Sequence, residues 1–296
     1  MLPKMVVLAG TNASGKSALG IKLASRFQGE IISADSRQVY RKMDLGSGKV
    51  TEAEMNGVPH HLLDVVDPGQ FFSMADYQRL AYEAADQILR RGHVPFLVGG
   101  TGLYIDAVAD GYLLSDRAPD HSLREKLEML ETPVLYQMLK EQLPSVDIDP
   151  KNRHRVMRAL ERLAQDDYHP AGKSPRFEVL KLGVTWPREK LKERIDERLD
   201  RRLNQGMTDE VKSLLDQGVS RDFLVKLGLE YKYLTWYLTG EMEYEQMKEE
   251  LSKAIKRFAK RQMTWFRRDP RIHWLNMSGD PEAEASELIS AFLGQA

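Results

Sequence analysis

Eight residues near the N-terminus have the types and spacing that phosphate binding needs. They read Gly10-Thr11-Asn12-Ala13-Ser14-Gly15-Lys16-Ser17, the pattern G-x-x-x-x-G-K-[ST], and lie between an apolar run at 5–8 and helically spaced apolar residues over 18–27. In this setting backbone N–H groups surround phosphate oxygens, the lysine adds a positive charge, and the serine hydroxyl ligates Mg²⁺. The sequence therefore predicts a P-loop for a di- or triphosphate, over a chance glycine-rich turn.

A carboxylate follows the next apolar run. Residues 30–34 have the pattern of a buried strand, and Asp35-Ser36-Arg37-Gln38 come directly after it. Open α/β sheets bind ligands at the carboxyl ends of their strands. Asp35 is therefore a candidate general base or a group that orients Mg²⁺ through water, and a helix N-cap is the structural alternative.

Two further motifs are weaker. Residues 94–98 form another apolar run, and the Gly-Gly-Thr-Gly sequence after it lets backbone approach a ligand while Thr101 offers a hydroxyl, unless it is only a tight turn. His60 and His61 are adjacent in an apparent strand, so their side chains point to opposite faces. We interpret this pair as structural rather than metal-binding.

The elements that must position these residues alternate between strand and helix. We expect strands at 5–8, 30–34 and 94–98, and helices at 18–27 and 74–91. This order predicts an α/β fold, a P-loop core with a mainly parallel sheet flanked by helices. We expect residues 1–113 to form the first part of the core, 114–176 an all-helical insertion, and 177–296 the second part, with basic C-terminal helices.

Charge is distributed unevenly, although the formal net charge is only −1. Residues 114–150 hold eight acidic and four basic side chains, whereas 151–176 hold seven basic and three acidic ones. Arg155, Arg158 and Arg162 recur at helical spacing there, as a solvated face or as a row that follows a phosphate backbone. Residues 253–268 hold no acidic residue, which favours a polyanionic partner over a merely solvated helix.

Arg194 and Arg198 lie four residues apart in a predicted helix over 188–204. At this spacing both can point at one anionic site. The alternative is a set of weak surface ion pairs with Glu193, Glu197 or Asp200.

Composition excludes several classes of protein. Hydrophobic residues make up 42% and charged residues 29%, which argues against disorder and against a membrane bundle. The absence of cysteine excludes a disulfide framework and a thiolate zinc site. We therefore expect a cytoplasmic enzyme or binding protein.

The series of motifs resembles the tRNA dimethylallyltransferases, also called tRNA isopentenyltransferases, over nearly the whole chain. The segments that carry the resemblance are 10–17, 33–40, 98–104, 152–161, 172–174, 193–198, 237–241 and 259–267. A P-loop alone is common to many families, but the full series is specific. The lack of cysteine fits the bacterial type, because eukaryotic relatives carry a zinc-finger extension.

The resemblance implies transfer of a dimethylallyl group from dimethylallyl diphosphate to N6 of the adenine next to the anticodon on its 3′ side. The catalytic residues that it implies are Lys16, Asp35, Thr101 and Arg198. Asp35 is the general base, and the Thr101 hydroxyl hydrogen-bonds at the reacting centre. Residues 10–17, Arg194 and Arg198 hold the diphosphate, with Mg²⁺ on Ser17 as the cofactor.

The resemblance also implies tRNA as the partner, bound through its anticodon stem-loop. The tRNA-binding residues would be Asp35, Ser36, Arg37, Gln38, Thr101, Arg124, Arg155 and Arg158. The target adenine must leave its stack. From its charge more than from any motif, we expect the basic C-terminal helix to hold the stem backbone. No membrane contact and no obligate protein partner is expected.

The chain departs from the family pattern at two places. Thr11-Asn12 stands where Pro-Thr is common, which changes side chains but not the backbone cradle. Leu229-Glu230-Tyr231 stands where Tyr-Lys-Glu is usual, and no role follows for Glu230.

Three other functions share parts of these motifs. An ATP-dependent small-molecule kinase would need the P-loop and Asp35 but not the acid-free helix. A passive RNA-binding protein would need the basic surfaces but not Lys16. An enzyme that prenylates free adenine nucleotides would have little use for the basic half of the insertion.

Overall fold

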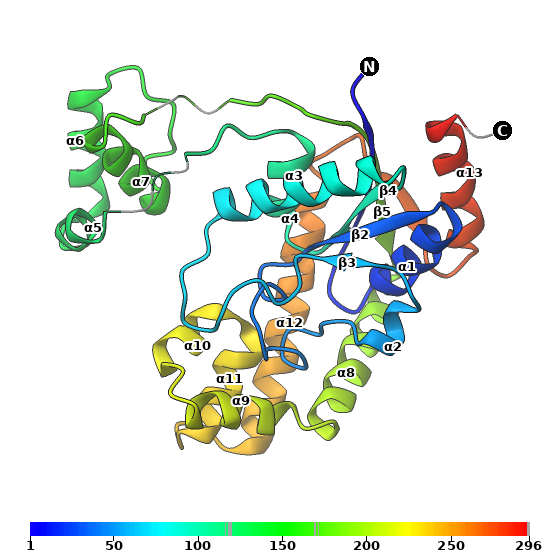
Figure 1. The fold of residues 1–296 in the computed structure, drawn as a ribbon. Helices are drawn as coiled ribbons and strands as arrows, with labels where there is room; N and C mark the ends of the chain where they lie inside the picture. The colour runs from blue at the N-terminus through cyan, green and yellow to red at the C-terminus, as the bar shows by residue number, and fades with distance from the viewer. Residues whose placement is uncertain (116, 118–119, 169, 171, 295–296) are drawn as a thin grey trace. The chain divides into compact units, whose positions relative to one another are not determined.

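A six-stranded sheet forms the centre of the protein (Figure 1). The computed structural model describes residues 1–115, 117, 120–168, 170 and 172–294. The strands are β1 (Lys4–Gly10), β2 (Gly29–Ala34), β3 (His60–His61), β4 (Val94–Gly99), β5 (Glu178–Thr185) and β6 (His273–Asn276). Their order is β3-β2-β4-β1-β5-β6, and each pair is parallel. The predicted parallel sheet is confirmed.

Helices cover both faces of this sheet, because alternate residues of each strand point to opposite sides. Val6 and Leu8 pack with α1 (Lys16–Arg26) and α13 (Pro281–Leu293) on one face. Met5 and Val7 pack with helices on the other face. Those helices are α3 (Met74–Arg90), α4 (Gly102–Ala109) and the C-terminal end of α12 (Tyr244–Phe266).

A second, helical core lies beyond the strand ends (Figure 1). Its helices are α8 (Arg188–Asn204), α9 (Met207–Asp216), α10 (Arg221–Leu227), α11 (Leu229–Leu238) and α12, whereas α2 (Glu52–Met55) is a single turn. The buried Val39 and Met43 pack into this core. The core therefore joins the chain that follows Asp35 to the chain that follows β5.

The chain divides into two compact units, Met1–Gly111 with Pro175–Ala296, and Tyr112–Ser174. The second unit holds α5 (His121–Glu128), α6 (Thr132–Gln142) and α7 (Arg153–Ala164). Leu135, Leu139 and Val156 are fully buried in a core of its own. None of the helices that the structure describes is long and apolar enough to cross a bilayer.

Candidate active site

The loop between β1 and α1 places residues 10–17 at the carboxyl edge of the sheet. β1 ends at Gly10, and α1 begins at Lys16. Gly15 precedes the helix with φ of 88°, a left-handed conformation that glycine adopts without strain. The free N–H groups of the first helical turn therefore face this β1–α1 loop, as anion binding at a helix N-terminus requires.

Lys16 is buried within the β1–α1 loop. Its side chain is 9% exposed, and Nζ donates to the Thr11 carbonyl at 3.4 Å. Burial lowers the pKa of Lys16 to about 8, and the negative charge of Asp35 partly opposes this shift. The neighbouring Ser17 is half-buried, and its hydroxyl makes no hydrogen bond to any residue the structure describes.

Two arginines of α8 approach the β1–α1 loop. Arg194 donates from Nε to the Ala13 carbonyl at 3.0 Å and stacks on Trp186, whose indole donates to the Ser14 carbonyl. Arg198 donates to the Gly48 carbonyl at 3.3 Å. Burial, and then the neighbouring Arg202 charge, lower the pKa of Arg198 to about 10. Neither arginine pairs with Glu193, Glu197 or Asp200, so the surface ion-pair alternative is wrong.

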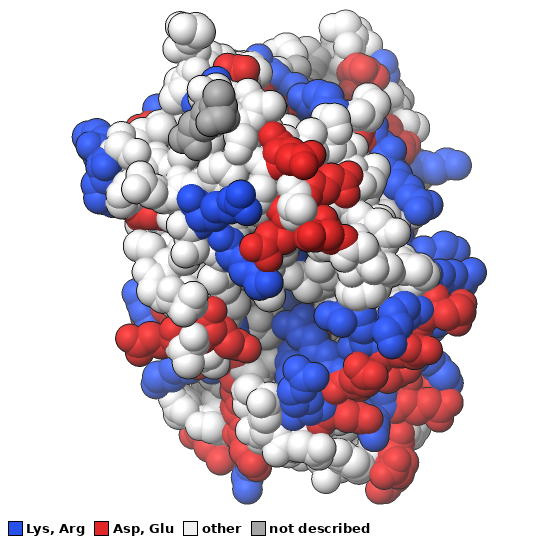
Figure 2. Space-filling model, turned by 90° about the vertical axis from the view of Figure 1, so that its right-hand side faces the viewer, with Lys and Arg blue, Asp and Glu red and all other residues white. Residues whose placement is uncertain are grey.

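A cavity of about 470 Å³ lies between these elements. Its walls include Ala13 to Ser17 of the loop, Arg194 and Arg198 of α8, and the segment 44–51. Figure 2 shows a face of the molecule on which Lys and Arg side chains gather around a hollow, with acidic side chains beside them. The basic side chains that line the cavity are Lys16, Lys49, Arg194, Arg198, Arg201 and Arg202. Such a lining suits a small polyanion.

Asp35 and Arg198 line the same small cavity. This cavity shares Ala13, Arg198 and Arg202 with the large one. One carboxylate oxygen of Asp35 accepts from the Arg37 N–H at 2.9 Å, and the residues after Asp35 form turns rather than a helix. The N-cap alternative is therefore wrong, and the second oxygen remains for other chemistry.

Thr101 is held beside Asp35 by two hydrogen bonds. Its hydroxyl accepts from the Ser36 N–H at 3.1 Å, and its own N–H donates to the Ala34 carbonyl at 3.0 Å. Because the hydroxyl proton takes no part in the first bond, it can still be donated to a ligand. Hydrogen bonds thus join the loops after β2 and β4 at the edge of the sheet.

Arg37 and Gln38 are oriented by the protein itself. Arg37 donates from Nε to the Leu227 carbonyl at 3.3 Å and lies 5.3 Å from the centre of the Phe258 ring. Gln38 accepts from the Ser33 hydroxyl at 2.9 Å and donates to the Gly48 carbonyl at 3.3 Å. Each side chain therefore has a fixed direction, while part of its hydrogen-bonding capacity remains free.

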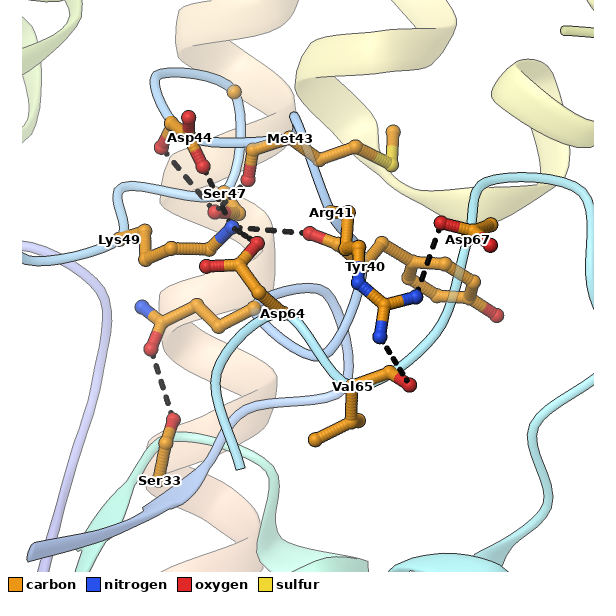
Figure 3. A network of polar contacts seen from close by, with 12 residues as sticks. Ser33, Tyr40, Arg41, Met43, Asp44, Ser47, Lys49, Asp64, Val65 and Asp67 are labelled. Atoms are coloured by element: carbon orange, nitrogen blue, oxygen red, sulfur yellow. Dashed lines mark hydrogen bonds and ion pairs between the residues drawn. The ribbon is translucent and has the colours of Figure 1, made fainter. Parts of the chain in front are cut away.

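Charged side chains that the sequence did not single out fix the segment 40–49. Figure 3 shows Lys49, whose Nζ binds Asp44 and Asp64 at 2.6 Å each and the Tyr40 carbonyl at 3.0 Å. Glu210 of α9 accepts the N–H groups of Asp44, Leu45 and Gly46 at 2.9, 2.6 and 2.8 Å. These contacts hold one wall of the large cavity.

Glu230, for which the sequence suggested no role, lines the small cavity. It accepts from Arg202 at 3.4 Å across a buried space between α11 and α8, and Arg202 also donates to the Leu45 carbonyl. The spacing of Arg198 and Arg202 on α8 could have indicated a third inward-facing arginine. Glu230, the acidic partner of Arg202, lies 28 residues away, and no local sequence pattern indicated the pair.

The arginines predicted to bind RNA in the unit Tyr112–Ser174 differ in availability. Arg124 binds both oxygens of the fully buried Glu161 at 2.6 and 2.9 Å, and Arg158 binds Glu161 at 3.0 Å. Only about a quarter of each arginine side chain is exposed. Arg155 is exposed and makes no side-chain hydrogen bond or ion pair within the described part of the chain. The solvated-face interpretation of this row is thus wrong for Arg158.

The histidine pair of β3 has local partners. His61 lies 2.7 Å from the buried carboxylate of Glu30, which Arg91 and His93 also contact, and His60 lies 2.8 Å from the Val58 carbonyl. Over the described residues, no group of three His, Cys, Asp or Glu side chains is placed to hold a metal ion.

Known proteins are similar to this chain in sequence and in fold. A family model described as "IPP transferase" matches residues 38–269. The chain is 42% identical to tRNA dimethylallyltransferase 2 of Shewanella sediminis, with 97% of each chain covered, and 42% identical to tRNA dimethylallyltransferase 1 of Geotalea uraniireducens, with 96% of each covered.

Solved structures agree with the sequence matches. The crystal structure of the tRNA isopentenylpyrophosphate transferase from Bacillus halodurans superposes with a TM-score of 0.76 at 37% identity and covers 99% of this chain and 97% of that one. A eukaryotic dimethylallyltransferase solved acting on tRNA gives a TM-score of 0.83 at 25% identity, covering 99% of this chain and 80% of the other. The chain therefore belongs to the IPP transferase family.

Proposed function

We propose that the protein transfers the dimethylallyl group of dimethylallyl diphosphate to N6 of the adenine 3′-adjacent to the anticodon in tRNA and releases diphosphate. The observation that carries this proposal is the pair of neighbouring cavities. The large, basic one suits a diphosphate, and the small one, which Asp35 lines, shares the Arg198 wall with it. An electrophile whose diphosphate lies in the large cavity and a weakly basic amine beside Asp35 would meet next to Arg198.

The diphosphate is the group that must be stabilised as the bond between allylic carbon and oxygen breaks. We assign its binding to residues 10–17, Arg194 and Arg198, with Lys16 and Arg198 next to the leaving oxygen. Cations that the protein holds in a fixed place stabilise developing charge more strongly than mobile cations in bulk solvent. The position of Arg198, which lines both cavities, supports its assignment to the leaving group.

The adenine amine must lose a proton as its nitrogen bonds to the allylic carbon. We assign that proton to the free oxygen of Asp35, while the Thr101 hydroxyl donates to the base or to the leaving oxygen. The N6–carbon bond then forms as the carbon–oxygen bond breaks, so that diphosphate and a protonated Asp35 remain. The Arg37 N–H, already bound to Asp35, fixes the carboxylate for this transfer.

Mg²⁺ fits the residues that are present. The Ser17 hydroxyl lines the large cavity and has no hydrogen-bond partner among the described residues. Mg²⁺ in proteins commonly takes one or two protein oxygens and completes its shell with phosphate oxygens and water. When bound, the ion would add positive charge to the diphosphate, and Ser17 would be its protein ligand.

Binding of tRNA would use the exposed basic face of α12 and the motif after β2. Arg257, Lys260 and Arg261 are exposed on α12, and Arg267 is exposed directly after it. The guanidinium groups of Arg261 and Arg37 each lie near the Phe258 ring. Guanidinium groups beside an aromatic ring suit both phosphates and an unstacked base. We assign the anticodon stem-loop to these residues and to Ser36, Gln38, Arg124, Arg155 and Arg158, in the cytoplasm where tRNA is modified.

One assay tests the proposal directly. The protein is incubated with Mg²⁺ and radiolabelled dimethylallyl diphosphate, and with either unmodified tRNA or AMP. We expect label in tRNA only, at the adenine 3′ to the anticodon. Label in AMP but not in tRNA contradicts the proposal, and consumption of ATP without labelling would favour a kinase.

Asp35→Asn separates chemistry from folding. Asparagine keeps an oxygen for the Arg37 N–H but cannot take a proton, so kcat should fall by about 10²- to 10⁴-fold. Affinity for tRNA in a filter-binding assay should change little. A large loss of tRNA binding with kcat preserved would show that Asp35 holds the RNA rather than the proton.

A further inference from the structure

A single buried amide of α12 links the two halves of the candidate site. Gln262 is 7% exposed. Its side-chain oxygen accepts from the Asn12 N–H at 3.0 Å, and its side-chain nitrogen donates to the Gly100 carbonyl at 2.8 Å. Asn12 belongs to the β1–α1 loop, and Gly100 directly precedes Thr101. The two ends of one side chain thus bind the phosphate loop and the loop after β4.

Close packing keeps Gln262 in this place. A Cβ atom on Gly100 would lie 2.7 Å from Nε2 of Gln262 and 3.2 Å from the Gly10 carbonyl, so a larger residue there would displace the amide. Trp265, one turn further along α12, donates to Asp106 at 2.9 Å and lies against Gly102. The helix is therefore fixed to the chain on both sides of Thr101.

The contacts continue from Gly100 to Asp35. The Thr101 N–H binds the Ala34 carbonyl, and the Thr101 hydroxyl accepts from Ser36. Through Gln262, an unbroken series of hydrogen bonds connects the Asn12 N–H to the backbone on both sides of Asp35. Beyond the strand ends, which pair directly through β4, this amide thus links the diphosphate cradle to the proposed base.

We propose that Gln262 is a positioning residue, which holds the phosphate loop at the correct distance from Thr101 and Asp35 and connects both to the RNA-binding helix. This inference rests on the proposed function. Transfer requires the amine and the allylic carbon to meet at about 3 to 3.5 Å, and an error of about 1 Å can cost about a hundredfold in rate. Gln262 faces inward, whereas Lys260 and Arg261 beside it face solvent.

The test separates positioning from RNA binding. In Gln262→Leu both hydrogen bonds are lost, and we expect kcat at saturating tRNA to fall by about a hundredfold. Affinity for tRNA should stay within about twofold of the wild type, because the amide does not reach the surface. Affinity for inorganic diphosphate, measured by calorimetry, should weaken. Gln246→Glu, at an exposed position of the same helix, is the matched control and should change none of these quantities.

Gln262→Glu supplies a readout that a purely structural role would not give. A neutral carboxyl group can form both hydrogen bonds, because it accepts from the Asn12 N–H and donates to the Gly100 carbonyl. An ionised carboxylate cannot donate to Gly100. Burial raises the pKa of such a carboxyl, and the nearby Lys16 charge opposes that rise. The kcat of Gln262→Glu relative to wild type should therefore increase as the pH falls from about 8 towards about 5. Thermal unfolding of each variant checks that it is folded.

Three results would overturn the inference. They are a kcat for Gln262→Leu within about twofold of wild type, a loss confined to tRNA affinity, and a Gln262→Glu ratio that does not change with pH. Failure of the proposed function looks different, because the wild type itself would then leave tRNA unlabelled. In that case the affinity of Gln262→Leu for inorganic diphosphate still tests the inference. An affinity equal to that of the wild type contradicts the link between Gln262 and the phosphate loop.

Discussion

Lys16 combines two properties that usually exclude each other, a positive charge and burial. Its pKa is lowered from 10.5 to about 8 by burial, so a fraction of the side chain is neutral near physiological pH in the absence of a ligand. An anion in the cavity restores the full charge. Binding of the diphosphate is therefore coupled to uptake of a proton.

This coupling predicts a pH dependence. The pKa of Lys16 lies below its ordinary value, so the charged form prevails below about pH 8 and is lost above it. Affinity for inorganic diphosphate should weaken as the pH rises through about 8, as titration calorimetry can measure. In Lys16→Arg the guanidinium stays charged, so any weakening that remains comes from the ligand's own ionisation. Equal pH profiles for the two proteins would exclude a role for Lys16 ionisation.

The residues that sequence could identify are those in local motifs. Asp35 and Thr101 follow predicted strands, and parallel strands bring such ends to one edge. Gln262, Glu210 and Glu230 also shape the site, but they meet partners between 28 and 250 residues away. Their polar side chains on helices resemble ordinary surface positions until the tertiary structure buries them, so no local pattern could reveal them.

At the scale of elements, the arginines of α5 and α7 differ in how firmly the protein already holds them. Arg124 and Arg158 neutralise the buried carboxylate of Glu161. Removal of one partner leaves an uncompensated buried charge, which is more costly than loss of an exposed ion pair.

A matched pair of variants tests this division. Glu161→Gln should lower the free energy of unfolding of the unit Tyr112–Ser174 by about 3 kcal/mol, because two arginines lose their counter-charge. Arg155→Ala should change stability by less than about 0.5 kcal/mol and weaken tRNA binding. Urea unfolding and filter binding measure the two effects. Wild-type tRNA affinity in Arg155→Ala would remove this residue from the interface.

The boundaries of an element can be predicted where local sequence signals set them, and not where a distant partner does. α8 begins and ends where its apolar stripe predicted, at Arg188 and Asn204, because its periodicity and the preceding Pro187 are local signals. β6 has only four residues, of which Leu275 is buried, and it exists because β5 offers it a parallel edge. A strand of that length has too little pattern to be predicted alone.

For the whole molecule, the net charge of −1 conceals segregation of charge. Lys and Arg side chains gather around the hollow of Figure 2 with acidic side chains next to them, and residues 253–268 hold no acidic residue. An average over the chain therefore says little about its partners.

The affinity for tRNA should depend strongly on salt concentration. Each lysine or arginine that contacts a phosphate releases counterions, so tRNA affinity should fall at least about a hundredfold between about 50 and 200 mM salt. The double variant Lys260→Ala, Arg261→Ala should reduce the slope of log affinity against log salt by about 2. A response to salt that is flat in the wild type would contradict binding through phosphates.

The pairing of β1 with β5 has a consequence for synthesis of the protein. Lys4 lies opposite Glu178, so the first strand to leave the ribosome waits for a partner made 174 residues later. At about 5 to 20 residues per second, that delay is on the order of ten seconds or more. During it, one edge of β1 stays open to wrong pairing, while the unit Tyr112–Ser174, with a core of its own, can fold before the sheet closes.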